Sequence, residues 1–340
     1  MQQPQHIRSL DGLRGIASFA VVLSHIILLF PGETWAGALV FGNEAVALFF
    51  CLSGFLMAYL YGGKAFTRRS ATDYLVHRFT RIYPVYFVAV ISVALLSMVP
   101  GLDYPQPLAG SIEIIRHVVL LGSTGVFWSI PPEIQFYVFF LVLWFWFEKP
   151  RDRLPLGVAI AIGFIALAYL GFPGPGILLP SKISYFLFGA FAGRLFALTG
   201  RLNGGHAIGF LTLAALAFFF ASRAIFHTEE SFWGVTSALA ATVIVFLTAT
   251  ESGVLAPLLG SAPLRHIGKI SFSLYLFHMP VMFLASKLLP ESLPVGLTIA
   301  LCIVAAMVFA DISYRVVEAP SRTVLIGAWK RRTLSTPLPA

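Results

Sequence analysis

The amino-acid sequence predicts an all-α integral membrane protein, a bundle of about ten transmembrane helices with both termini in the cytoplasm. Hydrophobic side chains make up 58% of the 340 residues, charged ones make up only 11%, and the mean hydropathy is +0.85. Soluble domains carry about 25% charged residues. The apolar residues also recur in runs close to the roughly 20 that a helix needs to cross the hydrocarbon core. Water is therefore not the expected solvent for most of this surface.

Ten apolar runs are long enough to serve as spans, with boundaries good to a few residues. They cover about residues 11–30, 43–61, 80–99, 132–148, 155–171, 182–198, 206–222, 233–250, 270–288 and 295–317. We therefore predict one transmembrane domain over residues 1–325, followed by a basic, proline-containing cytoplasmic tail, 326–340, that is disordered. The charges at Asp11 and Arg14 interrupt the first run and argue against a cleaved signal peptide.

The distribution of basic residues predicts the orientation of these spans. With the N-terminus in the cytoplasm, 19 of the 23 Lys and Arg residues fall in cytoplasmic loops or at the adjoining helix ends. The remaining four fall on the outer side: Arg116, Lys182, Arg223 and Lys287. Cytoplasmic loops of membrane proteins carry such an excess. The same bias explains the net charge of +8 without nucleic acid as a partner, with a small contribution from binding to anionic lipid.

Several apolar features are expected to serve the fold. The longest outer connection contains an apolar stretch, 112–127, that is too short to span and is expected to form a re-entrant or interfacial helix. Gly189 and Gly193 have the spacing of a small-residue packing seam between helices. Isolated thiols in apolar runs behave as small hydrophobes, so no disulfide or redox chemistry is expected of Cys51 and Cys302.

The first span contains an ionisable residue at a depth where such residues are costly. His25 lies in a run that is otherwise nearly all apolar, which indicates function, against the alternative of a histidine bonded by a neighbouring helix. Arg14 lies eleven positions earlier, about 16 Å along the axis, at the cytoplasmic mouth. Asp11 opens the helix, where an N-cap or an i,i+3 pair with Arg14 explains it at least as well. About 21 Å separates Asp11 from His25 in a straight helix, which excludes a direct dyad.

The fourth span begins on the outer side with a polar and aromatic cluster: Trp128, Ser129, Glu133 and Tyr137. Glu133 and Tyr137 are four residues apart and lie on one helix face. Glu133 falls in the outer third of the membrane, close to the depth inferred for His25. A carboxylate and an imidazole at one depth could serve as general base and orienting group. The alternative is an interfacial acid that complements the helix dipole.

The ninth span has a polar stripe. Ser271, Tyr275 and His278 recur at i, i+4 and i+7, so they are expected to face the bundle interior, where they bond other helices or the substrate. In the last span, three charged residues recur at the same spacing and are expected to pair internally: Asp311, Arg315 and Glu318.

Two arginines open the third span at the cytoplasmic face. Arg78 and Arg81 are three residues apart. Guanidinium groups carry fixed charge and planar donors, which suit a polyphosphate. Anchoring to the cytoplasmic side would account for one arginine and explains the pair less well.

Taken in order, these segments resemble acyltransferase family 3, the membrane O-acyltransferases that modify bacterial surface sugars. The matching segments are LDGLRGIA at 10–17, with His25 completing an Arg-x10-His spacing, FFCLSGFL at 49–56, RFTRIYP at 78–84, and residues 128–137, 267–280 and 314–320. Any one of these motifs is weak, whereas six in order from residue 9 to about 320 are specific.

The resemblance implies a multi-pass protein of the bacterial inner membrane that takes an acyl group, with acetyl the simplest, from cytoplasmic acyl-CoA. The acceptor would be a sugar hydroxyl at the outer side, in an exopolysaccharide, an O-antigen or a similar glycan. Carried over by position, His25 looks like the catalytic base, and Asp11 and Arg14 look like its first-helix partners. Arg78 and Arg81 look like donor contacts. Glu133 looks like an active-site acid. Some members carry a C-terminal hydrolase-like domain; without one, this chain is expected to act alone on its acceptor.

The expected mechanism has His25 take the proton from the acceptor hydroxyl as it attacks the thioester, with Glu133 or Tyr137 orienting the imidazole or the acceptor. No metal is required. A transporter or flippase would use the same buried polar groups as a permeation path, but no internal repeat or matching pair of interrupted helices is found. A third possibility is a structural partner in a glycan-assembly complex, in which Arg14 and His25 would be dispensable.

Overall fold

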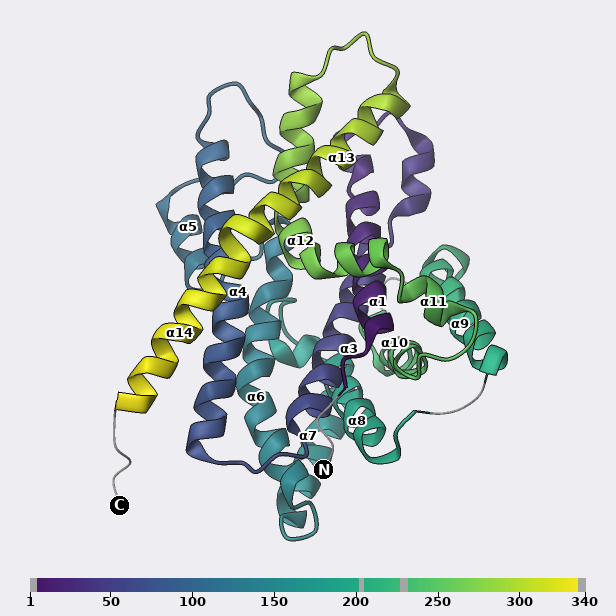
Figure 1. Ribbon diagram of the computed structural model, residues 1–340. Helices are drawn as coiled ribbons and strands as arrows, with labels where there is room; N and C mark the ends of the chain where they lie inside the picture. The colour runs from purple at the N-terminus through teal and green to yellow at the C-terminus, as the bar shows by residue number, and fades with distance from the viewer. Residues whose placement is uncertain (1–4, 202–204, 227–231, 336–340) are drawn as a thin grey trace. The chain divides into compact units, whose positions relative to one another are not determined.

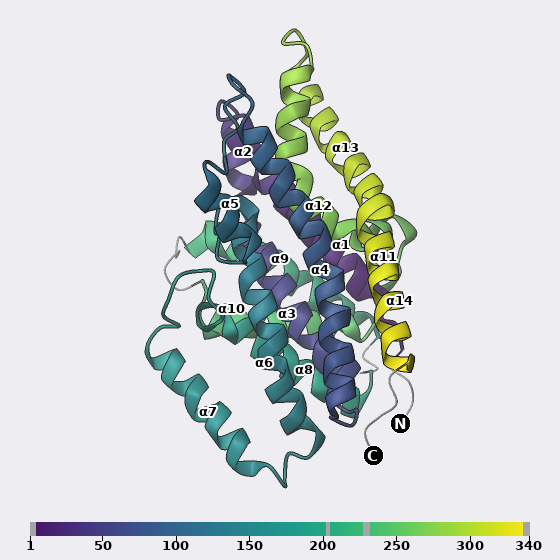
Figure 2. The same ribbon diagram turned by 90° about the vertical axis from the view of Figure 1, so that its left-hand side faces the viewer.

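The computed structural model describes residues 5–201, 205–226 and 232–335, and over these residues the chain forms helices and no strand (Figures 1 and 2). It divides into two compact units. The first consists of Met1–Ala65 with Trp128–Ser271, and the second of Phe66–Phe127 with Phe272–Ala340. The chain thus has two units where the sequence predicts a single domain over 1–325.

The α-helices that lie wholly in the first unit are α1 (Arg8–Ser24), α2 (Ile26–Leu29), α3 (Gly42–Tyr61), α6 (Ile130–Glu148), α7 (Leu154–Tyr169), α8 (Ile183–Thr199), α9 (Gly205–Phe226), α10 (Val235–Ala249) and α11 (Leu255–Leu259). The second unit contains α4 (Arg68–Ser97), α5 (Ser111–Val118), α13 (Val295–Ser313) and α14 (Ala319–Ser335). Helix α12 (Ala262–Leu288) belongs to the first unit up to Ser271 and to the second from Phe272. Four shorter helical segments complete the described chain: η1 (Thr34–Leu39), η2 (Gly125–Ser129), η3 (Leu179–Ser181) and η4 (Tyr314–Glu318).

All ten predicted spans coincide with helices. Six helical stretches of the described chain are long and apolar enough to cross a membrane, and four further apolar helices, α7, α8, α10 and most of α9, are shorter. Helix α7 has no buried residue within the structure, and its Ile162 and Ile165 are 61% and 66% exposed (Figure 2). A helix that is apolar all round and has most of its residues exposed needs lipid rather than water around it. The fold is therefore that of an α-helical membrane protein.

The structure differs from the predicted boundaries at three places. The first span is not one helix, because α1 ends at Ser24 and the short α2 begins at Ile26. Helix α4 begins at Arg68, well before the predicted 80, because Thr67 and Ser70 form a reciprocal capping box there. The predicted disordered tail is helical as far as Ser335, while 336–340 lie outside the described residues.

Packing between α3 and α8 forms the largest helix contact of the first unit, and it depends on glycine (Figure 1). A Cβ atom at Gly189 would collide with the backbone carbonyl of Cys51, and one at Gly193 would collide with that of Phe55. The predicted small-residue seam is confirmed, and Gly54 contributes to it from α3 by approaching the Phe186 carbonyl.

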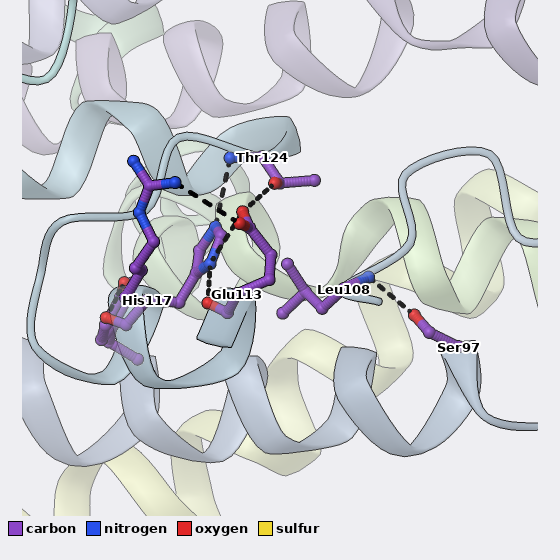
Figure 3. A network of polar contacts seen from close by, with 7 residues as sticks. Ser97, Leu108, Glu113, His117 and Thr124 are labelled. Carbon is purple, nitrogen blue, oxygen red and sulfur yellow. Dashed lines mark hydrogen bonds and ion pairs between the residues drawn. The ribbon is translucent and has the colours of Figure 1, made fainter. Parts of the chain in front are cut away.

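The connection between α4 and α6 is held in the second unit by a polar network (Figure 3). His117 is fully buried, its Nδ1 lies 2.8 Å from the Glu113 carbonyl, and its Nε2 accepts the backbone N–H of Thr124 at 3.1 Å. Thr124 also donates its hydroxyl to the Glu113 carboxylate at 3.0 Å. In the predicted 112–127 segment, the α-helix covers only residues 112–118, as part of α5, with Ile112 and Ile115 exposed.

Helices α13 and α14 are joined through the π-helical turn η4, as one long element of the second unit (Figure 1). Arg315 pairs with Asp311 at 2.7 Å, as predicted. Glu318 is buried and instead accepts a hydrogen bond from Ser273 at 2.7 Å. A π turn places more residues in one turn than an α turn does, so it shifts Glu318 away from the face that the i, i+7 spacing predicts.

Candidate functional site

His25 lies at the break between α1 and α2. Its backbone N–H bonds Val22 O three residues back, at 3.2 Å, so the Val21 carbonyl loses its ordinary helical donor. Two side chains replace that donor: the Ser24 hydroxyl donates to Val21 O at 2.8 Å, and His25 Nδ1 lies 2.8 Å from the same oxygen. A carbonyl oxygen can only accept, so His25 Nδ1 carries a proton. In the neutral ring, the lone pair is then on Nε2, as a general base requires.

Arg14 and Asp11 lie on α1 in the first unit but do not pair with each other in the way that the sequence suggests. Arg14 donates to the Ser271 hydroxyl at 3.2 Å, and Asp11 forms an ion pair with His6 at 2.7 Å. Asp11 is not the N-cap, since the helix begins at Arg8. Its carbonyl lies against Gly268, where any Cβ atom would collide with it. This close crossing of α1 and α12 fixes the position of Arg14.

Glu133 is the centre of a small hydroxyl network in the first unit. Its Oε1 accepts a hydrogen bond from Tyr137 at 2.5 Å and another from Ser53 at 3.2 Å. Two hydrogen bonds that converge on one carboxyl oxygen fix the orientation of the side chain. The predicted pairing of Glu133 and Tyr137 on one face is confirmed. Between Glu133 and His25, no hydrogen bond or ion pair is found in the described chain.

Ser53 is a contact that sequence reasoning missed. It lies in the FCLSGFL segment of α3, eighty residues from Glu133. Its position inside a matched motif was the available signal, but no spacing rule relates the two helices.

Trp128 and Ser129 directly precede α6. Ser129 is buried at the N-cap position, and Trp128 is half-buried with edge-on contacts to Phe50 and Trp233, whose ring centroids lie 6.1 and 5.6 Å away. Trp128 is thus part of an aromatic cluster in the same unit as Glu133.

That cluster surrounds a lysine that the sequence analysis used only for topology. Lys182 is 5% exposed and precedes α8, and its Nζ lies 3.7 Å from the Trp233 ring centroid and 5.6 Å from that of Trp128. The signal in the sequence was that Lys182 is one of the few basic residues on the outer side, whereas most lie on the cytoplasmic side.

In the second unit, Arg78 and Arg81 lie on α4. Arg78 is buried with its guanidinium 5.8 Å from the Tyr74 ring centroid, and Arg81 is half-buried. Arg322, on α14, lies within electrostatic range of both. Helix α14 packs on α4, and Trp329 donates to Asp73 at 2.7 Å, so the two helices hold three guanidinium groups near one another. Arg322 was not predicted, because its segment was expected to be part of the cytoplasmic end.

The predicted stripe of the ninth span is buried as expected. Ser271 is 1%, Tyr275 6% and His278 0% exposed. Tyr275 donates to the Val126 carbonyl at 2.9 Å, and His278 Nδ1 lies 2.9 Å from the Tyr275 carbonyl of its own helix. These hydrogen bonds of Tyr275 and His278 are to backbone carbonyls, whereas Ser271 accepts one from the Arg14 side chain. In the described chain, no group of three or more His, Cys, Asp or Glu side chains could hold a metal ion.

Comparison with known proteins gives relatives that are named O-acetyltransferases. YrhL of Bacillus subtilis, provisionally named a peptidoglycan O-acetyltransferase, is 27% identical over 97% of this chain and 57% of its own length. The peptidoglycan O-acetyltransferase OatA of Listeria monocytogenes is 24% identical over 94% of the chain and 56% of its own length. The O-acetyltransferase OatA of Staphylococcus aureus is 25% identical over 95% and 58%.

The chain thus spans somewhat more than half the length of these relatives. No solved structure matches it. The family model for the acyltransferase domain of family 3 matches residues 7–315, which is nearly the whole chain; the match ends before Glu318 and α14, so Arg322 lies outside it. By that match, the chain belongs to acyltransferase family 3.

Proposed function

We propose that this chain is a membrane O-acetyltransferase that moves an acetyl group from acyl-CoA to a hydroxyl of a peptidoglycan-type glycan. Membership of the family supports the acyl transfer, and the names of the relatives support acetyl and peptidoglycan. The observation that carries the proposal is the state of His25, whose Nδ1 is held as a donor to Val21 O.

The transfer requires a base that takes the proton of the acceptor hydroxyl and a group that orients the acceptor. His25 Nε2 takes the proton of the acceptor hydroxyl as its oxygen attacks the thioester carbonyl. The tetrahedral intermediate collapses, the C–S bond breaks, and the departing thiolate takes the proton back from the imidazolium. The products are the sugar ester and free CoA, so that atoms and charge balance. The carboxylate of Glu133, fixed by Tyr137 and Ser53, serves to orient the acceptor.

We assign the donor phosphates to the arginines of the second unit. Arg78, Arg81 and Arg322 bring three like charges together on two packed helices, an arrangement that an anionic ligand stabilises. The phosphates in the adenosine diphosphate part of CoA carry the negative charges that such a ligand needs. The residues present therefore fit this co-substrate.

We further propose that all ten apolar helices span the bacterial inner membrane and that both termini are cytoplasmic. The supporting observation is the placement of 19 of the 23 basic residues on one side of that topology. Reporter fusions after Ser335 and near Lys182 should then report opposite sides of the membrane.

The test of catalysis is a pair of histidine substitutions in the full chain. His25→Ala should lower acetyl transfer to a glycan acceptor by about 10²- to 10⁴-fold, the usual contribution of a general base. His206→Ala is the matched control, because this histidine is exposed at the start of α9 and should leave the rate unchanged.

Transfer is measured by mass spectrometry, as the acetyl mass added to the acceptor and as CoA released. A His25→Ala protein with the wild-type rate would contradict the proposal. Movement of substrate without release of CoA would instead favour a transporter.

A further inference from the structure

The aromatic cluster of the first unit contains a buried cation. Lys182 is 5% exposed, and no hydrogen bond or ion pair to its Nζ is found among the residues that the structure describes. Lysine is almost never buried this far without a partner, because desolvation of an ammonium is costly. Two indole faces recover only part of that cost. The remaining deficit favours an anionic partner from outside the described chain.

The cation is held in place by a loop that is fixed to α6. The side-chain amide of Gln135 donates to the Ile177 carbonyl at 2.9 Å and accepts the Leu179 N–H at 2.8 Å. This double contact fixes the turn that ends at Lys182, and it comes from the residue two positions after Glu133. The lysine and the proposed active-site acid are therefore positioned by one helix.

The indole ring of Trp233 is also held in place by its neighbours. Tyr185, one turn along α8 from Lys182, donates its hydroxyl to the Phe232 carbonyl at 2.6 Å, next to Trp233. Tyr185 and Phe232 also pack on the Trp233 ring, with centroids 5.5 and 5.1 Å away. Trp233 is nevertheless only half-buried, as is Trp128, so both indoles keep part of their surface open.

We propose that Lys182, Trp128 and Trp233 form a subsite for an oxyanion of the acceptor glycan. The ammonium pairs with a carboxylate or a phosphate, and the indoles pack against the apolar face of the sugar ring. This subsite rests on the proposed function for its role as an acceptor site. It makes the enzyme select charged glycans over neutral ones, and it assigns that selection to a residue remote in sequence from the catalytic motifs.

Binding without an acyl donor tests the subsite independently of transfer. Three probes are titrated into the full chain in lipid nanodiscs: N-acetylmuramic acid, its methyl ester, which has the same shape without the charge, and N-acetylglucosamine 1-phosphate. The dissociation constants are measured by calorimetry. The wild type should bind the free acid or the phosphate about tenfold more tightly than the ester, as expected for one charge-assisted hydrogen bond. Which of the two anions is preferred identifies carboxylate or phosphate as the natural group.

Substitutions then test whether the preference for the anionic probes depends on Lys182. Lys182→Met should abolish it while leaving the affinity for the ester unchanged, and Lys182→Arg should retain it. Lys287→Met is the matched control, since Lys287 also lies near an aromatic ring, 5.7 Å from that of Phe283, but is exposed.

Two results would overturn the proposal. An equal affinity of the wild type for all three probes would show that no anion is recognised, as would be the case if a carboxylate of the chain itself already neutralised the lysine. An equal loss of affinity for acid and ester in Lys182→Met would show a purely structural role. If the anion preference depends on Lys182 but no acetyl transfer is detected, the subsite stands and the proposed function fails.

Discussion

The residue with the most informative contacts is Glu133, because its surroundings bear on the two interpretations that the sequence leaves open. An acid that merely complements the helix dipole needs no partners and contributes about 0.3–1 kcal/mol. Glu133 instead accepts two hydroxyl donors on the same oxygen, one from its own helix and one from α3. Such convergence fixes the direction of a carboxylate and is typical of a site that must hold a substrate.

Glu133→Gln keeps the shape of this side chain and removes its charge. We expect it to lower kcat for acetyl transfer by at least tenfold, while Glu291→Gln, a substitution of an exposed acid, should have no effect. Tyr137→Phe should lower kcat by about tenfold in the wild type and by much less in Glu133→Gln, because the hydroxyl acts through the carboxylate. Steady-state kinetics of the wild type, Glu133→Gln, Tyr137→Phe and the double variant measure this coupling. Additive effects of the two substitutions would contradict it.

Among the helix contacts, the seam between α3 and α8 most clearly requires particular residues, because glycine is needed where the two backbones approach. Gly193→Ala should lower the thermal stability of the purified protein by about 1–3 kcal/mol, since its new Cβ meets the Phe55 backbone, which cannot turn away as a side chain could. Gly163→Ala on α7 is the matched control: it also replaces a helical glycine, but nothing lies within 4 Å of its Cβ. It should be neutral or slightly stabilising. Equal unfolding temperatures for the two variants in one detergent would show that the seam is not tightly packed.

The elements also show how far sequence reasoning reaches. Runs of apolar residues were sufficient to place a helix at each of the ten predicted spans, because solvation by lipid is a property of the run itself. The break at His25 was not predictable from that signal, since it results from two side chains that replace one backbone hydrogen bond. The π turn at Tyr314–Glu318 was not predicted for a similar reason. The spacing rule assumes 3.6 residues per turn, whereas the turn that contains Glu318 has more residues than that.

Sequence reasoning names candidate residues for the site but not the contacts between them. His25, Glu133 and Arg78 stand out because polar groups are costly in an apolar run. The contact of Ser53 with Glu133 and that of Lys182 with Trp233 join segments 80 and 51 residues apart, and they depend on how helices pack. A single sequence contains no local signal for such pairs.

For the molecule as a whole, the decisive property is a surface that water would not tolerate. Exposed aliphatic side chains extend along α7 and, in the second unit, along α13, where Val304 and Val308 are each more than half exposed. A soluble protein rarely exposes such a large apolar surface, whereas in a bilayer this surface is solvated. Insertion therefore depends on every exposed position of a span remaining apolar, even where it contacts no other residue.

This dependence can be tested with two exposed isoleucines, one inside a predicted span and one outside the predicted spans. Ile162 lies in the middle of α7 and is 61% exposed, and Ile112 lies on α5, outside the predicted spans, and is 75% exposed. In water, aspartate would be harmless at either position. In the membrane, Ile162→Asp should cost about 2.5–3.5 kcal/mol of insertion free energy, because the short side chain cannot reach the interface. Ile112→Asp should cost much less. The amount of each protein in the membrane fraction, measured by a C-terminal fluorescent fusion, checks this difference, and equal amounts would mean that α7 does not cross the bilayer.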